Sequence, residues 1–334
     1  MSFGKRVTTT TQDYFAPRAV NTVLKENEFA ARMLSKAKMF RGEQMRFPVI
    51  VSKNNTGQSF SGLDTFDTSA SDTRIRLSFA PKSYAINVTL PLDEVTANMG
   101  SEEQVLNLVD IEMETAAQGG ADDIGTMFYG TGAGKDFLGL EAIVDDGTNA
   151  ATYGGQSRTT YSTLNSTVTA SGGTLTLAKM TTLWNNISVE NSEPDAIFTT
   201  PTVWQFYEEL LQANERIIRS KASDKLMTGA LKNGLEFKGV PVLRDNKCTS
   251  GVMYMLSMDY LQWYGRKFAM AEEVKFKPQT DANPVSNVKG LGFSWTGWKK
   301  PVNQAAISGQ IMLYGELISK APNKHGKLTG ITSV

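Results

Sequence analysis

Residues Ser101 to Tyr129 read SEEQVLNLVDIEMETAAQGGADDIGTMFY, and the rest of the chain is organised around this stretch. Apolar or small residues recur in it at spacings of three and four, which is the period of one helix face. Those positions are Val105, Val109, Met113, Ala116, Gly120, Ile124 and Met127. Ser101 and Gln104 fit a capping box, and Gly130 suits a helix end. The pattern predicts one helix over 101–129, roughly 43 Å long at about 1.5 Å per residue.

The composition is that of a folded globular chain. Of 334 residues, 40% are hydrophobic and 20% charged. Lys plus Arg and Asp plus Glu both number 34, so the basic excess of a phosphate-gripping protein is missing. The single cysteine, Cys248, excludes an internal disulfide framework and fits a reducing cytosol. No stretch approaches the run of about 18 apolar residues that a membrane span needs, and Met1 to Thr11 lacks a signal-peptide core.

Two β-prone stretches precede the helix and predict a long hairpin. They are Met45 to Val51 and Thr73 to Ala80, and in the second Ile75, Leu77 and Phe79 alternate with Arg74, Arg76 and Ser78. Ser52 to Asp72 between them is polar and far longer than an ordinary hairpin turn. The residues before the hairpin, 1–44, predict an extended arm with one or two short amphipathic helices.

The apolar residues of the long loop are candidates for contact with another subunit. Phe60, Leu63 and Phe66 would be exposed on a monomer, so we expect a neighbouring subunit to cover them; a disordered surface loop is the alternative. Arg74 and Arg76 are candidates for ion pairs between subunits or for ordinary strand-surface charges.

The remaining elements alternate. A third strand, Lys82 to Leu90, precedes the helix, and Gly130 to Gly139 forms a glycine-rich exit from it. Asp145 to Gly173 is polar, without a period, and marks a domain boundary. We then expect helices over Leu177–Ile187 and Thr202–Ser220, the latter capped by Thr200, strands over Asp195–Thr199, Phe237–Leu243 and Val252–Ser257, and a strand through Ile311–Leu317 that returns to the first sheet.

Motifs that would carry chemistry are missing. Gly130 to Asp136 lacks the residues of a phosphate-binding loop, and Asp145 to Asn149 reads as a turn because it lacks a calcium loop's glycine and distal glutamate. His325, the only histidine, is expected to be solvated in a polar tail. The acidic pairs at 102–103, 122–123 and 208–209 splay about 100° apart on a helix, as solvated faces or subunit salt-bridge partners. No catalytic, cofactor-binding or metal-binding residue is predicted.

The order of these parts resembles the major capsid proteins of tailed bacteriophages, which have the Hong Kong 97-type fold. The hairpin Met45 to Ala80 with the strand Lys82 to Leu90 matches the extended loop and peripheral strands, and Ser101 to Tyr129 matches the spine helix. Further matches are Phe198-Thr199-Thr200-Pro201-Thr202-Val203-Trp204, Phe237-Lys238-Gly239-Val240-Pro241-Val242, Met253-Tyr254-Met255-Leu256 and Leu313-Tyr314-Gly315-Glu316-Leu317. The resemblance spans nearly the whole chain.

The resemblance implies an α+β fold with an N-terminal arm (1–44), an extended loop hairpin and peripheral strands (45–92), a peripheral domain with the spine helix (93–144), a mixed α/β axial domain (145–290), and a return to the peripheral domain with a C-terminal tail (291–334). It also implies a non-enzymatic shell subunit that forms hexamers and pentamers of an icosahedral head around double-stranded DNA. The chain would assemble in the host cytoplasm and reside in the virion.

The expected partners are further copies of the chain, a separate scaffolding protein, a portal protein, DNA bound without sequence specificity and a possible decoration protein, with no membrane and no cofactor. Covalent crosslinking is not assigned, because the only lysine of the loop is Lys53 at its base. An encapsulin-like cargo shell of the same fold is the alternative function. A second alternative is an α/β enzyme with its site in 174–257, for which the sequence offers no catalytic set.

Gly119 and Gly120 interrupt the long helix, and each costs about 1 kcal/mol relative to alanine in a helix interior. In a shell subunit that changes curvature between ring positions, these glycines are candidates for a hinge.

Overall fold

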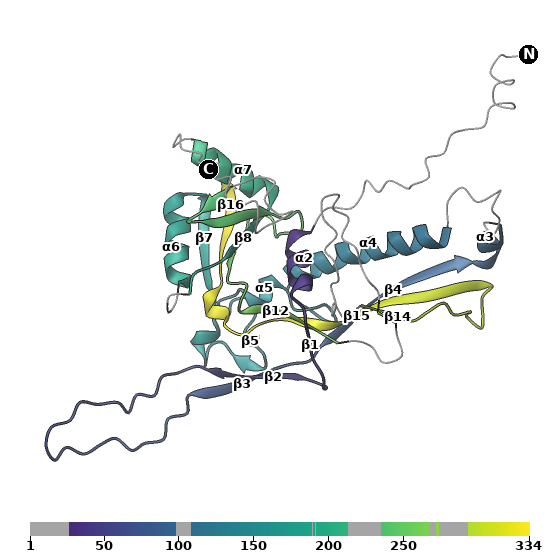
Figure 1. Ribbon diagram of the computed structural model, residues 1–334. Helices are drawn as coiled ribbons and strands as arrows, with labels where there is room; N and C mark the ends of the chain where they lie inside the picture. Colours follow the sequence, from purple (N-terminus) through teal and green to yellow (C-terminus); the bar gives the residue numbers. More distant parts are fainter. Residues whose placement is uncertain are drawn as a thin grey trace, which may run out of the picture.

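The computed structural model describes residues 27–97, 108–188, 190, 192–212, 235–266, 272–273 and 293–334. Figure 1 shows the long helix α4 (Leu108–Tyr129) lying along a sheet, with a second sheet and its helices at one end. The predicted helix is therefore confirmed from Leu108 onward, and its buried side carries Gly120, Ile124 and Phe128. The predicted cap at Ser101, most of the arm over 1–44 and the end of the helix over 213–220 lie outside the described residues.

The sheet beside α4 is built around the long strand β15 (Ala306–Ser319). β4 (Lys82–Pro91) pairs antiparallel with it from Pro91↔Ala306 to Lys82↔Gly315, which confirms the predicted return of the last segment. The other strands of this sheet are β12 (Leu261–Gly265), β14 (Phe293–Trp295), β1 (Lys38–Met39) and β13 (Glu272–Glu273). A short helix, α3 (Leu92–Ala97), follows β4 directly.

Two glycines of α4 let its neighbours approach closely. A Cβ on Gly120 would lie 1.9 Å from Ile86 Cδ1 of β4, and a Cβ on Gly125 would lie 1.2 Å from the side chain of Asn27. Asn27 caps the helix α2 (Glu28–Ser35) by accepting a hydrogen bond from Ala30 N. Since no larger residue fits at either position without a shift, these glycines set the distance of α4 from both elements.

The second sheet has the strand order β7, β16, β11, β8, β10, β9. Its bounds are β7 (Thr167–Thr174), β16 (Gly326–Ser333), β11 (Met253–Leu256), β8 (Ala196–Thr199), β10 (Val240–Arg244) and β9 (Glu236–Phe237). The helices α6 (Leu177–Ile187) and α7 (Pro201–Gln212) flank it (Figure 1). Thr200 Oγ1 accepts a hydrogen bond from Val203 N at 3.3 Å, so its predicted role as N-cap is confirmed.

One hydrophobic core joins the two sheets. Phe29 of α2 lies 5.2 Å from the ring of Phe198 in β8, and Tyr129 at the end of α4 lies 5.9 Å from the ring of Tyr254 in β11. Asp245, 1% exposed, accepts hydrogen bonds from Phe29 N at 3.0 Å and from the Tyr129 hydroxyl at 3.1 Å. A smaller core between the second sheet, α6 and α7 contains Leu183, Tyr207 and Met255 among others.

Three sequence predictions are wrong in the second sheet. Phe237–Leu243 is not one strand: Lys238 and Gly239 both have positive φ, so β9 and β10 form a tight antiparallel hairpin. The polar stretch up to Gly173 contains β7, which pairs in parallel with β16. His325 is not in a solvated tail, because it is fully buried just before β16, an inner strand of the sheet.

Sheet membership does not follow the predicted ranges 145–290 and 291–334. β12 lies within the first range but pairs with β15, and β16 lies within the second range but pairs with β7 and β11. The remaining described elements are α5 (Leu140–Ile143), the β5 (Thr152–Tyr153) and β6 (Gln156–Ser157) hairpin, and the short turns Ser162–Leu164 and Pro322–Lys324. None of the helices in the described ranges is long and apolar enough to cross a membrane.

Candidate assembly surface

The predicted hairpin is present as an antiparallel ribbon that projects from the molecule (Figure 1). β2 (Met45–Ile50) pairs with β3 (Arg74–Phe79) from Met45↔Phe79 to Ile50↔Arg74. A hydrogen bond from Val51 N to Thr73 O at 3.0 Å continues the pairing by one step. Beyond it, residues 52–72 form no strand or helix and are almost all exposed; we call them the extended loop.

The apolar side chains of the extended loop are exposed, as predicted for an isolated chain. Phe60 is 65% exposed, Leu63 103% and Phe66 58%. The rings of Phe60 and Phe66 meet edge to face at 5.2 Å, so they shield each other only in part. Gln58 Nε2 donates to Thr65 O at 2.7 Å and holds the two sides of the tip together. These residues make an apolar tip that the described part of the chain does not cover.

The base of the ribbon is anchored to the body. Leu77 is fully buried, and Phe79 packs against the ring of Tyr153 at 5.2 Å. Ser78 N donates to Gly154 O at 2.9 Å, and Gly154 has a positive φ of 57° in the turn between β5 and β6. A Cβ there would lie 2.9 Å from both Leu77 and Phe79, so glycine permits the contact. The root of the extended loop is therefore fixed to the body of the molecule.

The face of the ribbon opposite Leu77 and Phe79 carries exposed arginines. Arg74 and Arg76 are exposed, and the β2–β3 register places Pro48 opposite Arg76 and Ile50 opposite Arg74. Among the described residues neither arginine forms an ion pair. Arg46 is exposed on the same face, and the sequence prediction missed it. Extending the period-two alternation into β2 would have found it.

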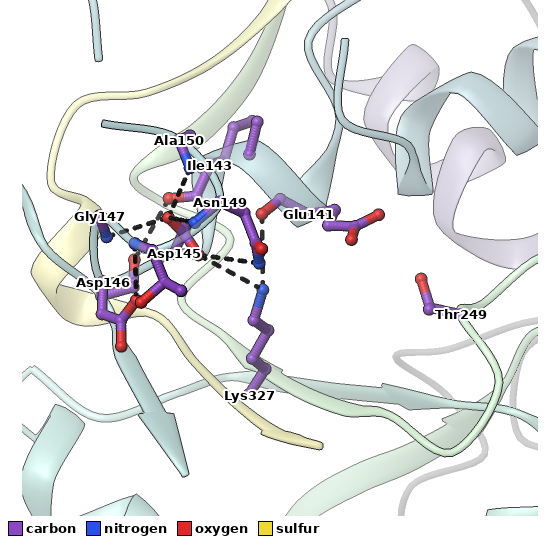
Figure 2. Close-up of polar contacts among 12 residues, drawn as sticks. Glu141, Ile143, Asp145, Asp146, Gly147, Asn149, Ala150, Thr249 and Lys327 are labelled. Carbon is purple, nitrogen blue, oxygen red and sulfur yellow. Dashed lines mark hydrogen bonds and ion pairs between the residues drawn. The ribbon is translucent and has the colours of Figure 1, made fainter. Parts of the chain in front are cut away.

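A polar recess of about 300 Å³ lies beside the second sheet, and Figure 2 shows its contacts. Asp145, 1% exposed, accepts hydrogen bonds from three backbone amides of the following turn, those of Gly147, Asn149 and Ala150, at 2.9 to 3.1 Å. Lys327 of β16 is 4% exposed, and its ammonium lies 4.0 Å from Asp145 Oδ1 and 3.5 Å from Glu141 O. Burial lowers the pKa of Lys327.

The hydrogen bonds that Asp145 accepts hold in place the turn that lines the recess. The predicted turn at Asp145 to Asn149 is confirmed, whereas the burial of Asp145 was not predicted from the sequence. The guanidinium of Arg158, fully buried, donates to the backbone oxygens of Ala142 and Ile143 at 2.7 and 3.0 Å. Within the described residues, no group of His, Cys, Asp and Glu side chains is arranged to hold a metal ion.

His325 and Ser319 form a hydrogen-bonded pair that is structural. His325 Nδ1 accepts from Ser257 N at 3.2 Å, so Nε2 carries the proton and donates to Ser319 Oγ at 2.7 Å. A protonated Nε2 does not act as a base toward serine, and both side chains are fully buried. Burial lowers the pKa of His325 to about 3, so the ring stays neutral in the folded chain.

The other residues considered for a chemical role also have structural roles. Cys248 is buried in a turn, where desolvation raises the pKa of its thiol well above its usual range. Asp122, assigned to a solvated face or a subunit contact, pairs with Lys247 of the same chain at 2.6 Å. The glycine-rich exit accepts hydrogen bonds from Lys82 Nζ at Gly132 O and Asp136 O. Backbone carbonyls that face a lysine are not a phosphate cradle.

Comparison with solved structures shows which known proteins share this fold. The chain is similar to a subunit of the cyanophage A-1(L) capsid at a TM-score of 0.72 and 17% identity, over 97% of this chain and 98% of that one. It is also similar to the SrpI encapsulin of Synechococcus elongatus (TM-score 0.62, 10% identity, 99% and 96% covered) and to the capsid of the myovirus XM1 (0.57, 14%, 99% and 99%). No known sequence family and no curated protein sequence matches the chain.

Proposed function

We propose, from the Hong Kong 97-type fold that this chain has, that it is the major capsid protein of a tailed bacteriophage. Copies of it would assemble in the host cytoplasm into the hexamers and pentamers of an icosahedral head that encloses double-stranded DNA. In this role the protein is structural and not an enzyme, and its final location is the virion. The observation that carries the proposal is the extended loop, whose exposed apolar tip projects from an anchored ribbon.

A projecting loop without a core of its own suits a shell subunit. Full burial of a large apolar side chain stabilises a contact by roughly 1.5 to 3 kcal/mol, so Phe60, Leu63 and Phe66 supply a modest contact on each neighbour. Symmetry repeats such a contact around every subunit, and many weak contacts give a closed assembly. Arg74 and Arg76, exposed on the ribbon, would form ion pairs with the same neighbour.

The further partners belong to the same proposal. Assembly would use a separate scaffolding protein and a portal protein, and a decoration protein is a possible outer partner. Equal numbers of basic and acidic residues, 34 each, suit a shell that packages DNA without binding it tightly or reading its sequence.

The test is a pair of loop variants expressed beside the wild-type chain, each with and without a candidate scaffold. Deletion of residues 56–70 is expected to give a soluble, folded subunit that closes no shells, as seen by size-exclusion chromatography and electron microscopy. Replacing Phe60, Leu63 and Phe66 together by serine should reduce shell yield in the same way, because only the apolar tip is lost.

A matched control uses polar residues of the same loop. Thr65→Ser and Thr68→Ser change two exposed side chains and remove only one methyl group from each, leaving the apolar tip intact, so normal shells are expected. Normal shells from the triple serine variant would remove the loop from the proposal. A compact wild-type monomer under all conditions would overturn the capsid function itself.

A cargo-enclosing shell is the second candidate, favoured by the similarity to the SrpI encapsulin. The contents of purified particles separate the two functions: a co-purifying cargo protein supports the compartment, and scaffold or nucleic acid supports the phage head. The enzyme alternative has less support, because in the described parts of 174–257 the one thiol is buried and no histidine occurs.

A further inference from the structure

The polar recess beside the second sheet contains a lysine whose nitrogen makes only long polar contacts (Figure 2). Asp145 receives its short hydrogen bonds from the backbone of its own turn, and Asn149 Nδ2 donates to Asp145 Oδ1 at 3.3 Å. Lys327 Nζ lies 4.0 Å from the same oxygen. Within the described ranges, its one hydrogen bond is that of 3.5 Å to Glu141 O, which is long for such a bond. The ammonium of Lys327 is therefore buried without a short hydrogen bond.

The surroundings of Lys327 favour its neutral amine form. The side chain is 4% exposed, so water solvates its charge poorly, and burial lowers its pKa. The carboxylates of Asp145, Glu141 and Asp146 act in the opposite direction, and the guanidinium of Arg158 adds to the lowering. The neutral amine is the nucleophilic form of lysine, and desolvated lysines of this kind form covalent bonds with carbonyl compounds.

The recess gives small molecules access to Lys327. Its volume of about 300 Å³ is small for a ligand site, and Lys327 is one of the residues that line it. Asp146, Thr148 and Asn149 line the same recess and are exposed, so this side of it is open to solvent. A compound of a few carbon atoms can therefore enter from the side of the turn and reach the buried amine.

The charges of the recess select the kind of compound that can react. Glu141, Asp145 and Asp146 line the recess together with Lys327, so anionic compounds are repelled. Acylation of Lys327 would remove the positive charge beside the buried Asp145, and reaction with carbon dioxide would place a carbamate anion there. An iminium ion formed with an aldehyde keeps one positive charge on the lysine nitrogen. Small aldehydes without a charge are therefore the class of compound that fits.

We propose that Lys327 is a site that binds small uncharged aldehydes as a covalent iminium adduct. The neutral amine adds to the carbonyl carbon, and one proton passes from nitrogen to the carbonyl oxygen to give a carbinolamine. The hydroxyl group then takes a proton from solvent and leaves as water, while the nitrogen lone pair forms the C=N bond. No oxidant or reductant is needed, and the adduct carries the same charge as the original ammonium. The inference goes beyond the proposed shell function and does not depend on it.

Reductive alkylation of the wild-type chain tests the site. Limiting propanal is added at neutral pH with cyanoborohydride, which reduces an iminium ion to a stable amine, and peptide mapping by mass spectrometry measures the adduct at each lysine. Lys327 is expected to be the first lysine to react, ahead of the exposed Lys53 and Lys299, whereas exposure alone would give the reverse order. In urea the preference for Lys327 should be lost, because it depends on the folded recess.

A matched pair of variants tests whether the recess is the route to the amine. Thr148→Trp places a large side chain on the open side of the recess and should abolish the preference for Lys327. Thr152→Trp makes the same change at an exposed residue outside the recess, and its labelling should match the wild type. Both substitutions are at exposed positions, so thermal midpoints should stay near that of the wild type.

Two outcomes would overturn the proposal. If Lys327 of the folded chain reacts no faster than the exposed lysines, it is a buried structural residue and not a binding site. If it reacts first but Thr148→Trp leaves its rate unchanged, the recess does not admit the aldehyde. Neither outcome bears on shell formation, which size-exclusion chromatography and electron microscopy measure separately.

Discussion

Two buried residues, Glu316 and His325, contribute to the pH dependence of this chain's stability. Glu316 of β15 is 3% exposed and accepts a hydrogen bond from Leu138 N, yet burial raises its pKa to about 7. His325 is fully buried, and the same physical cause lowers its pKa to about 3. In both cases the neutral form is favoured because the interior solvates charge poorly. The two groups therefore drive stability in opposite directions on acidification.

Glu316→Gln removes the glutamate's contribution to the pH dependence of stability and leaves that of His325. The folded state of the wild-type chain holds the Glu316 proton more tightly than the unfolded state, so Glu316 adds stability as pH falls through about 7 towards 4.5. Without it, the free energy of unfolding should fall by about 2 kcal/mol between pH 6.5 and 5, at about 1.4 kcal/mol per pH unit. Urea unfolding at both pH values measures this. If the variant and the wild type show the same dependence of the free energy of unfolding on pH, Glu316 is ionised in the folded chain.

His325→Gln removes the histidine's contribution to the pH dependence of stability and leaves that of Glu316. The unfolded chain protonates His325 below pH 6.5 and the folded chain does not until about 3, so the histidine removes stability as pH falls through that window. The variant loses the hydrogen bonds to Ser257 and Ser319, which lowers its stability by the same amount at every pH. Its free energy of unfolding should nevertheless rise as the pH falls from 7 to 5. A falling free energy in that range would contradict the assignment.

At the scale of elements, the two adjacent glycines of α4 have different surroundings. A Cβ on Gly120 would clash with Ile86, whereas a Cβ on Gly119 would meet nothing within 4 Å. Packing against β4 thus explains Gly120 but not Gly119. The hinge proposed from the sequence therefore rests more on Gly119, where no contact within the described chain requires glycine.

Alanine at each position separates packing from flexibility. Gly120→Ala should lower the free energy of unfolding by about 1 to 3 kcal/mol, because Ile86 must shift. Gly119→Ala should raise it by about 0.5 to 1 kcal/mol through helix propensity. Denaturant unfolding of the soluble loop-deletion subunit measures both. If Gly119→Ala also lowers shell yield while stabilising the subunit, the hinge is supported; normal shells would contradict it.

The sequence predicts elements with a strong local period and misses those that depend on distant partners. The helix stripe ending at Ile124 and Met127, the alternation through Ile75 to Phe79 and the cap at Thr200 are local signals, and the structure confirms them. β7 contains Ser171, Gly172 and Gly173 and has little apolar character, so it is a strand only because β16 pairs with it. The candidate contact residues of the extended loop could be named from the sequence as apolar side chains in a long polar loop, but Arg46 was missed because the alternation seen in β3 was not extended into β2.

At the scale of the whole molecule, the shared core couples the two sheets. Contacts such as Phe29 with Phe198 and Tyr129 with Tyr254 cross between them, and buried Asp245 bonds to α2 and to the end of α4. Neither sheet can lose its packing without exposing apolar surface of the other. The subunit is therefore expected to unfold as one unit.

Calorimetry of the loop-deletion subunit tests this coupling. One transition is expected, with equal calorimetric and van't Hoff enthalpies. Asp245→Asn should lower its midpoint without splitting it, because the buried hydrogen-bond acceptor for Phe29 N and Tyr129 is weakened. Two resolved transitions in the parent subunit would show that the sheets are separate cooperative units.

The position of β15 and β16 in the two sheets also has a consequence for synthesis. Ribosomes release these strands after every other described strand, yet β15 is the strand that joins β4, β12 and β14, and β16 lies between β7 and β11. A nascent chain cut short before Ala306 lacks an inner strand of each sheet and presents unpaired strand edges. Under the proposed shell function, truncated translation products would be excluded from assembly, and proteolysis could remove them before they enter a growing particle.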